Sequence, residues 1–399
     1  MGYSATKEKT NYFLSQPHQP FFILGILNAV LMMLLFGLSY KGFITLEMSN
    51  LQFHVYSLIF TFFTNVFTGF LFTTFPRFCQ TQVINQKYYL NVFYLSAFGS
   101  LLFLLGAISN YLLMIVGMVF LFLSQVFIVV KLQEIYLSGT AHDKKDAFWI
   151  LTANYFGLLG HFLFIFIAFA GVLSFSLYLF NVTITLSFYL YLIFLAFSVA
   201  QRMIPFFSHS FAQKNENFVK IIFVLLVSKT LMSSFDVKSV EIIIDLLLGS
   251  YLLLEFRRWE LPLFTSAPIL WVLHLALFWL PAAFLLSALS LIGELFLDIS
   301  FYFFNIHLLA LGFLTTVLIG FGTRVTLGHS GQPPHADRLA ANIFWFIQIV
   351  VVLRALFSFN VAFGWGADFL FDISLSAWLI LFLVWAGRYG KVLVFGSKL

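Results

Sequence analysis

The stretch that decides the fold is residues 301–322, FYFFNIHLLALGFLTTVLIGFG. It is apolar over about the 20 residues that an α-helix needs to cross a bilayer, and it carries one histidine, His307. Polar and apolar residues do not alternate in it, so it predicts a membrane helix and not a barrel strand. The whole chain has this character, since 61% of its 399 residues are hydrophobic and 9% are charged.

Twelve runs of this kind predict an all-α, polytopic membrane protein with about twelve transmembrane helices. The runs cover residues 20–40, 54–75, 90–107, 111–130, 147–170, 177–200, 219–232, 238–255, 268–288, 301–322, 340–360 and 369–387. The first run is of full length and lacks a small-residue cleavage pattern, so we expect a retained helix. The expected organisation is a cytoplasmic segment at 1–19, a single transmembrane domain at 20–388 and a cytoplasmic tail at 389–399.

Basic residues gather in alternate loops. They are Lys7, Lys9, Arg77, Lys87, Lys131, Lys144, Lys145, Arg202, Lys214, Arg257, Arg258, Arg324, Arg338, Arg388, Lys391 and Lys398. The opposite loops carry Lys41 and Lys238, beside Glu47, Asp236, Glu294, Asp298 and Asp368. This pattern follows the positive-inside rule with both termini cytoplasmic. The net charge of +5 therefore reflects topology, with membrane lipids as partners and no nucleic acid.

Several signatures of enzymes are missing from the sequence. It contains no Walker loop, dinucleotide glycine pattern, His-Glu-x-x-His, nucleophile elbow or Cys-x-x-Cys-His. Hydrolases and nucleotide-driven pumps are therefore disfavoured. Cys79 is the one cysteine, so neither an intramolecular disulfide nor a thiolate metal cluster can form.

Histidines at membrane depth are the main chemical signal, because ionisable side chains are costly in lipid. By topology His54 and His307 share the outer half of the membrane, while His274 and His329 share the inner side. Neutral imidazole binds heme iron and copper alike. Two groups of imidazoles at different depths would suit two metal centres. His161, near the middle of its run, is placed either to approach a flat cofactor or to pack against a neighbouring helix.

Other polar groups leave alternatives open. Thr61, Asn65 and Thr68 follow His54 on one helical stripe, which either joins helices or faces a ligand cavity. Arg354 needs an anionic partner at its depth. A heme propionate is one candidate, and the carboxylates of Asp245, Glu294 and Asp298 are the others.

The most specific segment is residues 322–333, GTRVTLGHSGQP, which begins at the last residue of the run 301–322. Gly328 and Gly331 bracket His329, and glycines permit turns that other residues resist. An ordinary loop anchored by Arg324 is the alternative to a binding segment.

These residues resemble the NnrS family of bacterial inner-membrane proteins. Thr323–Gly331 is similar to the family's Arg-Val-Ser-Leu-Gly-His-Thr-Gly signature, and His307–Gly312 to the histidine approach before it. Further matches are Gln19–Phe22, Gly69–Pro76, Arg202–Phe207, Leu261–Phe264, Leu270–His274 and Trp279–Pro281. The matches run from residue 18 to residue 333. Two departures stand out: Gln19 replaces a usual arginine, and Val55, Tyr56 and Ser57 follow His54 where the family tends to have His-x-His-Glu.

The resemblance implies a protein that contains heme b and copper and acts in nitric oxide handling, denitrification or protection against nitrosative stress. It implies His54, His307, His329 and His274 as metal ligands, with His161 and Arg354 also in contact with a cofactor. The missing second histidine implies a lost copper ligand or another metal stoichiometry. Binding of nitric oxide, its reduction and support of another metalloenzyme all fit. The alternatives are a secondary transporter with a polar path through the bundle and a metal carrier or assembly factor.

Overall fold

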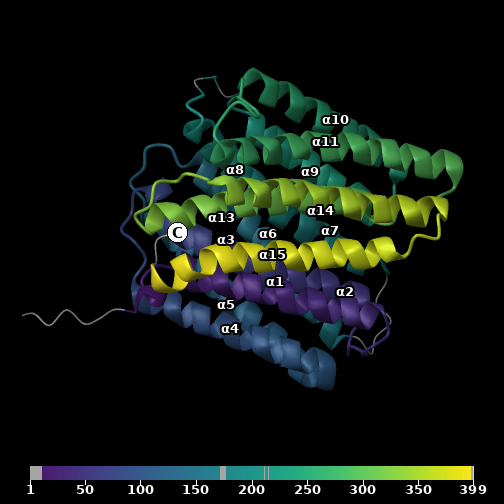
Figure 1. Cartoon of the computed structure of the whole chain (residues 1–399), viewed down its shortest axis with the longest axis horizontal. Helices are drawn as coiled ribbons and strands as arrows, with labels where there is room; N and C mark the ends of the chain where they lie inside the picture. The colour runs from purple at the N-terminus through teal and green to yellow at the C-terminus, as the bar shows by residue number, and fades with distance from the viewer. Residues whose placement is uncertain (1–10, 171–176, 211, 214, 397–398) are drawn as a thin grey trace, which may run out of the picture.

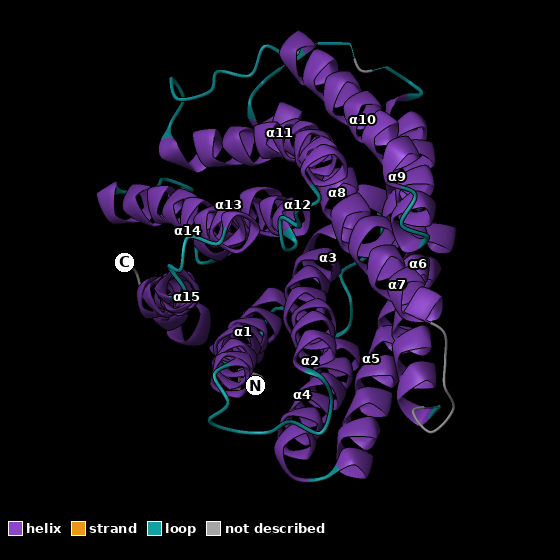
Figure 2. Cartoon of the chain, turned by 90° about the vertical axis from the view of Figure 1, so that its right-hand side faces the viewer, coloured by secondary structure: helices purple, strands orange, loops and turns teal. Residues whose placement is uncertain are grey.

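The chain folds into a bundle of helices that run roughly along its long axis (Figure 1). The computed structural model describes residues 11–170, 177–210, 212–213, 215–396 and 399. Every regular element in these ranges is helical, and no strand occurs among them (Figure 2). The expected all-α class is confirmed.

Three of the helical rods pass from α-helix to π-helix and back to α-helix. The elements are η1 (Tyr12–Leu14), α1 (His18–Tyr40), α2 (Asn50–Tyr56), η2 (Ser57–Phe63), α3 (Thr64–Cys79), α4 (Gln86–Ser109), α5 (Tyr111–Ser138), α6 (Lys145–Phe169), α7 (Leu177–Thr185), η3 (Leu186–Ile193), α8 (Phe194–Phe207), α9 (Phe218–Ser234), α10 (Lys238–Arg258), α11 (Pro268–Leu297), α12 (Phe304–His307), η4 (Leu308–Thr315), α13 (Thr316–His329), α14 (Arg338–Phe363) and α15 (Phe369–Phe395).

Ten rods of the described chain are long and apolar enough to cross a membrane, so this is a multi-pass membrane protein. Helices also form at the two other predicted runs, as α9 and α10. α9 has 17 residues and is shorter than the ten membrane-crossing rods. α10 is less apolar than those rods, because it carries charged residues such as Glu241 and Asp245. Large apolar side chains point outward along the bundle, among them Val116, Phe162 and Leu383, as expected for surfaces that contact lipid.

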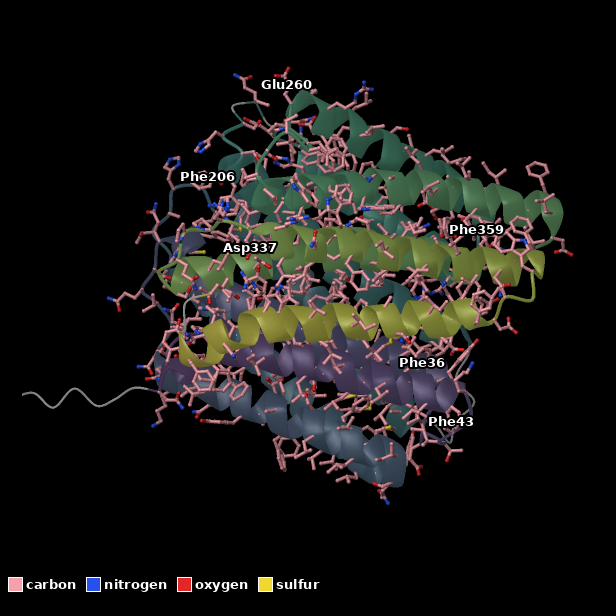
Figure 3. The ribbon with its side chains drawn as sticks, viewed as in Figure 1. Phe36, Phe43, Phe206, Glu260, Asp337 and Phe359 are labelled. Atoms are coloured by element: carbon pink, nitrogen blue, oxygen red, sulfur yellow. The ribbon has the colours of Figure 1, made fainter. Side chains whose placement is uncertain are left out.

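The two ends of the described chain meet at one end of the bundle, since the ring of Tyr12 contacts Gly396. Phe206 projects at this end and Phe43 at the other, and both are 75% exposed (Figure 3). The predicted boundary after residue 322 differs from the structure. Helix α13 continues through His329, and the chain turns at Gly331, whose φ is +74°.

Three central rods contain π-helix, namely η2, η3 and η4. η2 contacts η3, and η3 contacts η4. Threonine side chains reinforce two of these wider turns, because the hydroxyls of Thr64 and Thr315 donate to the carbonyls of Ile59 and Ala310, five residues back. π-Helical turns often mark functional positions in helices. The three rods surround the middle of the bundle (Figure 2).

Close packing of α4 on α5 depends on Gly117. A Cβ added there would overlap the backbone nitrogen of Phe103 on α4. The two helices can therefore approach closely because residue 117 has no side chain.

We predict that Gly117→Ala lowers the thermal unfolding temperature of the detergent-purified protein, because the methyl group forces α4 away from α5 at a cost of about 1–3 kcal/mol. Gly387→Ala is the matched control, since Gly387 is also helical and has open space around its would-be Cβ. Equal unfolding temperatures for both variants would contradict this packing.

Candidate functional site

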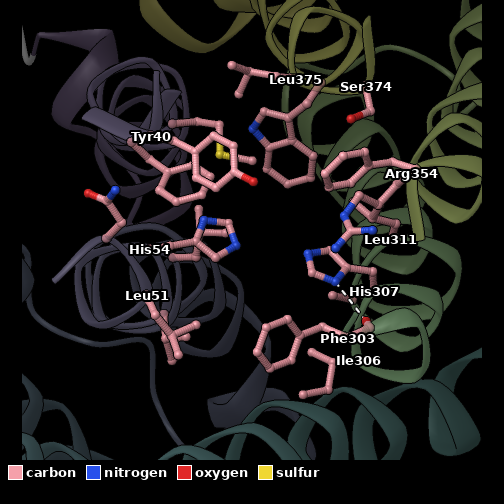
Figure 4. A pocket seen from close by; sticks show the side chains of 18 of the residues that line it. Tyr40, Leu51, His54, Phe303, Ile306, His307, Leu311, Arg354, Ser374 and Leu375 are labelled. Carbon is pink, nitrogen blue, oxygen red and sulfur yellow. Dashed lines mark hydrogen bonds between the residues drawn. The ribbon is translucent and has the colours of Figure 1, made fainter. Parts of the chain in front are cut away.

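His54 and His307 face each other across a cavity (Figure 4). Their ring centroids are 6.2 Å apart, and their planes differ by 19°. A nitrogen of each ring points into the space between them (Figure 4). The structure thus brings together the two histidines that topology placed at one depth.

Local sequence explains where each ring sits. Helix α2 begins with a capping box, in which the Ser49 hydroxyl accepts from Gln52 N and the Gln52 side chain accepts from Ser49 N. His54 follows one turn later, just before η2. His307 is the last residue of α12, directly before η4. Both rings therefore sit at the change from α- to π-winding in two of the three central rods.

The cavity has a volume of about 380 Å³ and a mostly apolar lining, which includes Phe36, Leu58, Phe188 and Trp378. Cofactor and small-molecule sites are usually cavities of about 300–1,000 Å³ with few polar groups. The size and lining match such a site.

The two imidazoles differ in their hydrogen bonds. Nδ1 of His307 lies 2.9 Å from the carbonyl oxygen of Phe303, which can only accept, so this nitrogen carries the proton and Nε2 is left bare. The His54 ring packs on the ring of Phe36, with centroids 4.4 Å apart. The buried Nδ1 of His54 has no hydrogen-bond partner among the described residues. Buried nitrogen atoms rarely stay unbonded. The His54 ring therefore has a nitrogen that is free to bind a ligand or a metal ion.

Arg354 of α14 lies on the cavity wall (Figure 4). Its guanidinium donates to the Ser358 hydroxyl at 2.6 Å and to the Tyr302 carbonyl at 3.2 Å. Two predicted partners are used elsewhere, because Asp245 pairs with Lys229 and Glu294 with Lys238. No carboxylate of the described residues forms an ion pair with Arg354, so its charge faces the cavity uncompensated.

A second pair of imidazoles lies at the end of the bundle where the described chain begins. His329, the last residue of α13, meets His18, the first residue of α1, with centroids 4.8 Å apart and planes tilted by 48°. His18 is 1% exposed, and its Nδ1 has no partner among the described residues. Sequence reasoning missed His18. The available signal was its position just before the first apolar run, at the depth of His329.

His161 has both ring nitrogens occupied. They lie 2.7 Å from the Tyr56 hydroxyl and 2.7 Å from Gln125 Oε1, and the ring stacks on Phe60 at 4.0 Å. Tyr56, two residues after His54, makes its contact with His161 through the phenol oxygen. This environment is that of a hydrogen-bonded core histidine.

His274 is also apart from the facing pair. Its Nε2 lies 2.6 Å from the Ser208 hydroxyl, and its Nδ1 lies 3.5 Å from that of Ser266. The structure does not bring His274 to His329. Nor do the described residues contain any group of three or more His, Cys, Asp or Glu side chains that could hold a metal ion.

The polar stripe after His54 joins helices. Asn65 donates to the Thr61 carbonyl at 2.7 Å and accepts from the Ser96 hydroxyl of α4 at 2.8 Å. The hydroxyls of Thr61 and Thr68 donate to carbonyls four residues back. None of these three side chains lines the cavity of His54.

Comparison with known proteins identifies one family. The model of a family described as NnrS protein matches residues 12–395, nearly the whole chain. No curated protein matches the sequence.

Proposed function

The chain belongs to the NnrS family, and we propose that it is a heme-binding protein of the bacterial inner membrane that handles nitric oxide or protects against nitrosative stress. The observation that carries this proposal is the facing pair of imidazoles, His54 and His307, in an apolar cavity. The family supplies the link to nitric oxide, while the residues of the cavity support the heme.

His54 and His307 would hold the heme iron between them, since their ring centroids are 6.2 Å apart and a nitrogen of each ring points into the space between the rings (Figure 4). Two nitrogen–metal bonds of about 2 Å each fit within that separation. The hydrogen bond from His307 Nδ1 to Phe303 holds the ring with Nε2 directed inward, as is usual for metal-bound histidines.

Arg354 supports the same assignment through its charge. A guanidinium binds carboxylates well, and heme carries two propionates. The Ser358 hydroxyl and the Tyr302 carbonyl hold Arg354 at the cavity wall. The sequence has one cysteine, Cys79, and no Cys-x-x-Cys-His, so the expected group is non-covalent heme b.

Bound heme would supply an iron centre that exchanges electrons, or that takes a diatomic gas in place of one of the two imidazoles. The chain's own residues would place the group and keep its surroundings dry, since Phe36, Phe188 and Trp378 form apolar walls. A small apolar gas can reach such a site through the bilayer, so a hydrophilic channel is not needed.

We predict that the purified protein shows a heme Soret band and that His307→Ala abolishes it. His54→Ala should remove or shift the band, because one of the two imidazoles that would hold the iron is lost. Arg354→Gln should lower the heme content several-fold by removing the partner of a propionate. Absorption spectra and the heme-to-protein ratio measure these effects.

His335→Ala and Arg338→Gln are the controls, because both side chains are exposed and lie outside the cavity. A folded protein without colour, grown with ample heme, would refute the heme proposal and favour the transporter alternative. Full heme retention in both His307→Ala and His54→Ala would refute the assigned ligands.

For the copper that family membership suggests, we propose His18 and His329 as the ligands. The two ring centroids are 4.8 Å apart, close enough for both imidazoles to reach one ion. The donors are neutral imidazoles, which copper accepts readily. The unpartnered, buried Nδ1 of His18 is the observation that supports this site.

We predict that elemental analysis finds copper in protein from copper-supplemented cells, and that His18→Ala and His329→Ala each reduce it while leaving the heme band intact. His142→Ala, a change at an exposed histidine, should have no effect. A copper ratio near zero in the unmodified protein would overturn this assignment.

We further propose that α9 and α10 also cross the membrane, which gives twelve spans with both termini in the cytoplasm. Support comes from the alternating basic loops and from the meeting of Tyr12 with Gly396 at one end of the bundle. α9 packs on η3, and α10 packs on α9 and α11, as parts of the same bundle.

We predict opposite accessibility for two cysteines placed at the ends of α9 in a Cys79→Ala background. An impermeant maleimide should label Val237→Cys from outside intact spheroplasts and should label Gln213→Cys only after permeabilisation. Labelling of both cysteines from one side would show that α9 does not cross.

A further inference from the structure

A buried cluster of charged side chains joins α9, α10 and α11, apart from the cavity of His54 and His307. Lys229 Nζ lies 2.6 Å from Glu241 Oε1 and 2.6 Å from Asp245 Oδ2. The Ser287 hydroxyl donates to the same Asp245 oxygen at 2.6 Å. All four residues are buried, and Lys229 and Asp245 are 0% exposed.

The cluster does not balance its charge. It holds one cation, Lys229, and two carboxylates, those of Glu241 and Asp245, which sum to one negative charge when all are ionised. From η3 the face of the Tyr189 ring approaches Lys229 Nζ at 5.7 Å. Lys238 lies one turn before Glu241, but it pairs with Glu294 of α11 at 3.0 Å. An uncompensated charge is strongly disfavoured in a protein interior.

One atom of the cluster has no partner. Asp245 Oδ2 accepts from both Lys229 and Ser287, whereas Asp245 Oδ1 is buried and accepts no hydrogen bond among the described residues. An ionised carboxylate normally uses both oxygens. Adding a proton to Oδ1 would remove the excess charge and leave the two bonds to Oδ2 in place.

We propose that the cluster of Lys229, Glu241 and Asp245 is a proton-binding site, in which Asp245 carries one exchangeable proton at neutral pH. The proton comes from water at the outer end of α10 and returns there on release. This inference does not rest on heme binding. Ionisable groups within membrane helices commonly mark proton relays.

A line of ionisable groups leads from that end to Asp245. Side-chain exposure falls from 32% at Lys238 and 15% at Glu294 to 5% at Glu241, and then to 1% and 0% at Lys229 and Asp245. Lys238, Glu241 and Asp245 lie at three- and four-residue spacings on one face of α10. Asp236, two residues before Lys238, is a further charged group at this end of α10. α10 lies at the edge of the bundle between α9 and α11 (Figure 2).

Infrared spectroscopy of the purified protein in lipid tests the proposal. We expect a C=O stretching band of a protonated carboxyl group at neutral pH, shifted when aspartate is ¹³C-labelled at its carboxyl carbon and unmoved by labelled glutamate. The band should also shift in D₂O within minutes, because the proton exchanges with the outer water. This arm uses the unmodified chain, so it does not depend on how a variant folds.

Variants add a test of the charge balance. Asp245→Asn should remove the band, and so should Glu241→Gln, since Lys229 then neutralises the remaining carboxylate. Lys229→Met should roughly double the band, because neither carboxylate keeps a cation. Asp298→Asn is the control, an isosteric change at an exposed outer position that should leave the band unaltered.

Absence of a protonated-carboxyl band at neutral pH would overturn the proposal, as would a band that survives in Asp245→Asn or that moves with labelled glutamate alone. A band that does not respond to D₂O would refute exchange with the outer water. A colourless protein that still shows the aspartate band would refute the heme proposal and leave the proton site standing.

Discussion

A polar atom inside this bundle must find a partner within the protein, because lipid and packed phenylalanine rings offer none. Most buried hydroxyls and amides meet this demand locally, as Thr61 does with the carbonyl four residues back. The imidazoles that do not meet it stand out for that reason. His54 and His18 each keep a buried nitrogen without a partner in the described part of the chain, and each faces a second histidine from a distant part of the sequence. Both proposed metal sites follow from this constraint.

The sequence predicted helices well, since a long apolar run has few other folds available to it. It also placed His54 and His307 at one depth, because helical rise and loop charge fix depth without tertiary contacts. It could not reveal the π-helical segments. α- and π-helices bury similar side chains, and the difference lies in backbone bonds such as the one from the Thr64 N–H to the carbonyl of Ile59, five residues back.

The remaining site assignments depended on contacts between helices, which no pattern within one helix reports. His161 is bonded by Tyr56 and Gln125, and His274 by Ser208. Tyr56 and Gln125 lie on other helices, and Ser208 directly follows α8. His18 was hidden for a different reason. It lies in the polar segment that precedes the first apolar run, and only the approach of α1 to α13 places it beside His329.

The cavity and the buried cluster each hold a charge that is not balanced by a neighbouring side chain. Lys229 pairs with Asp245, and Lys238 pairs with Glu294. Among the described residues no carboxylate forms an ion pair with Arg354. The bundle thus keeps a positive charge at the cavity wall and an excess negative charge in the cluster. η3 separates them, with Phe188 lining the cavity and the ring of Tyr189 facing Lys229. In a medium of low dielectric constant water does not screen either charge, so each needs a counterion or a proton of its own.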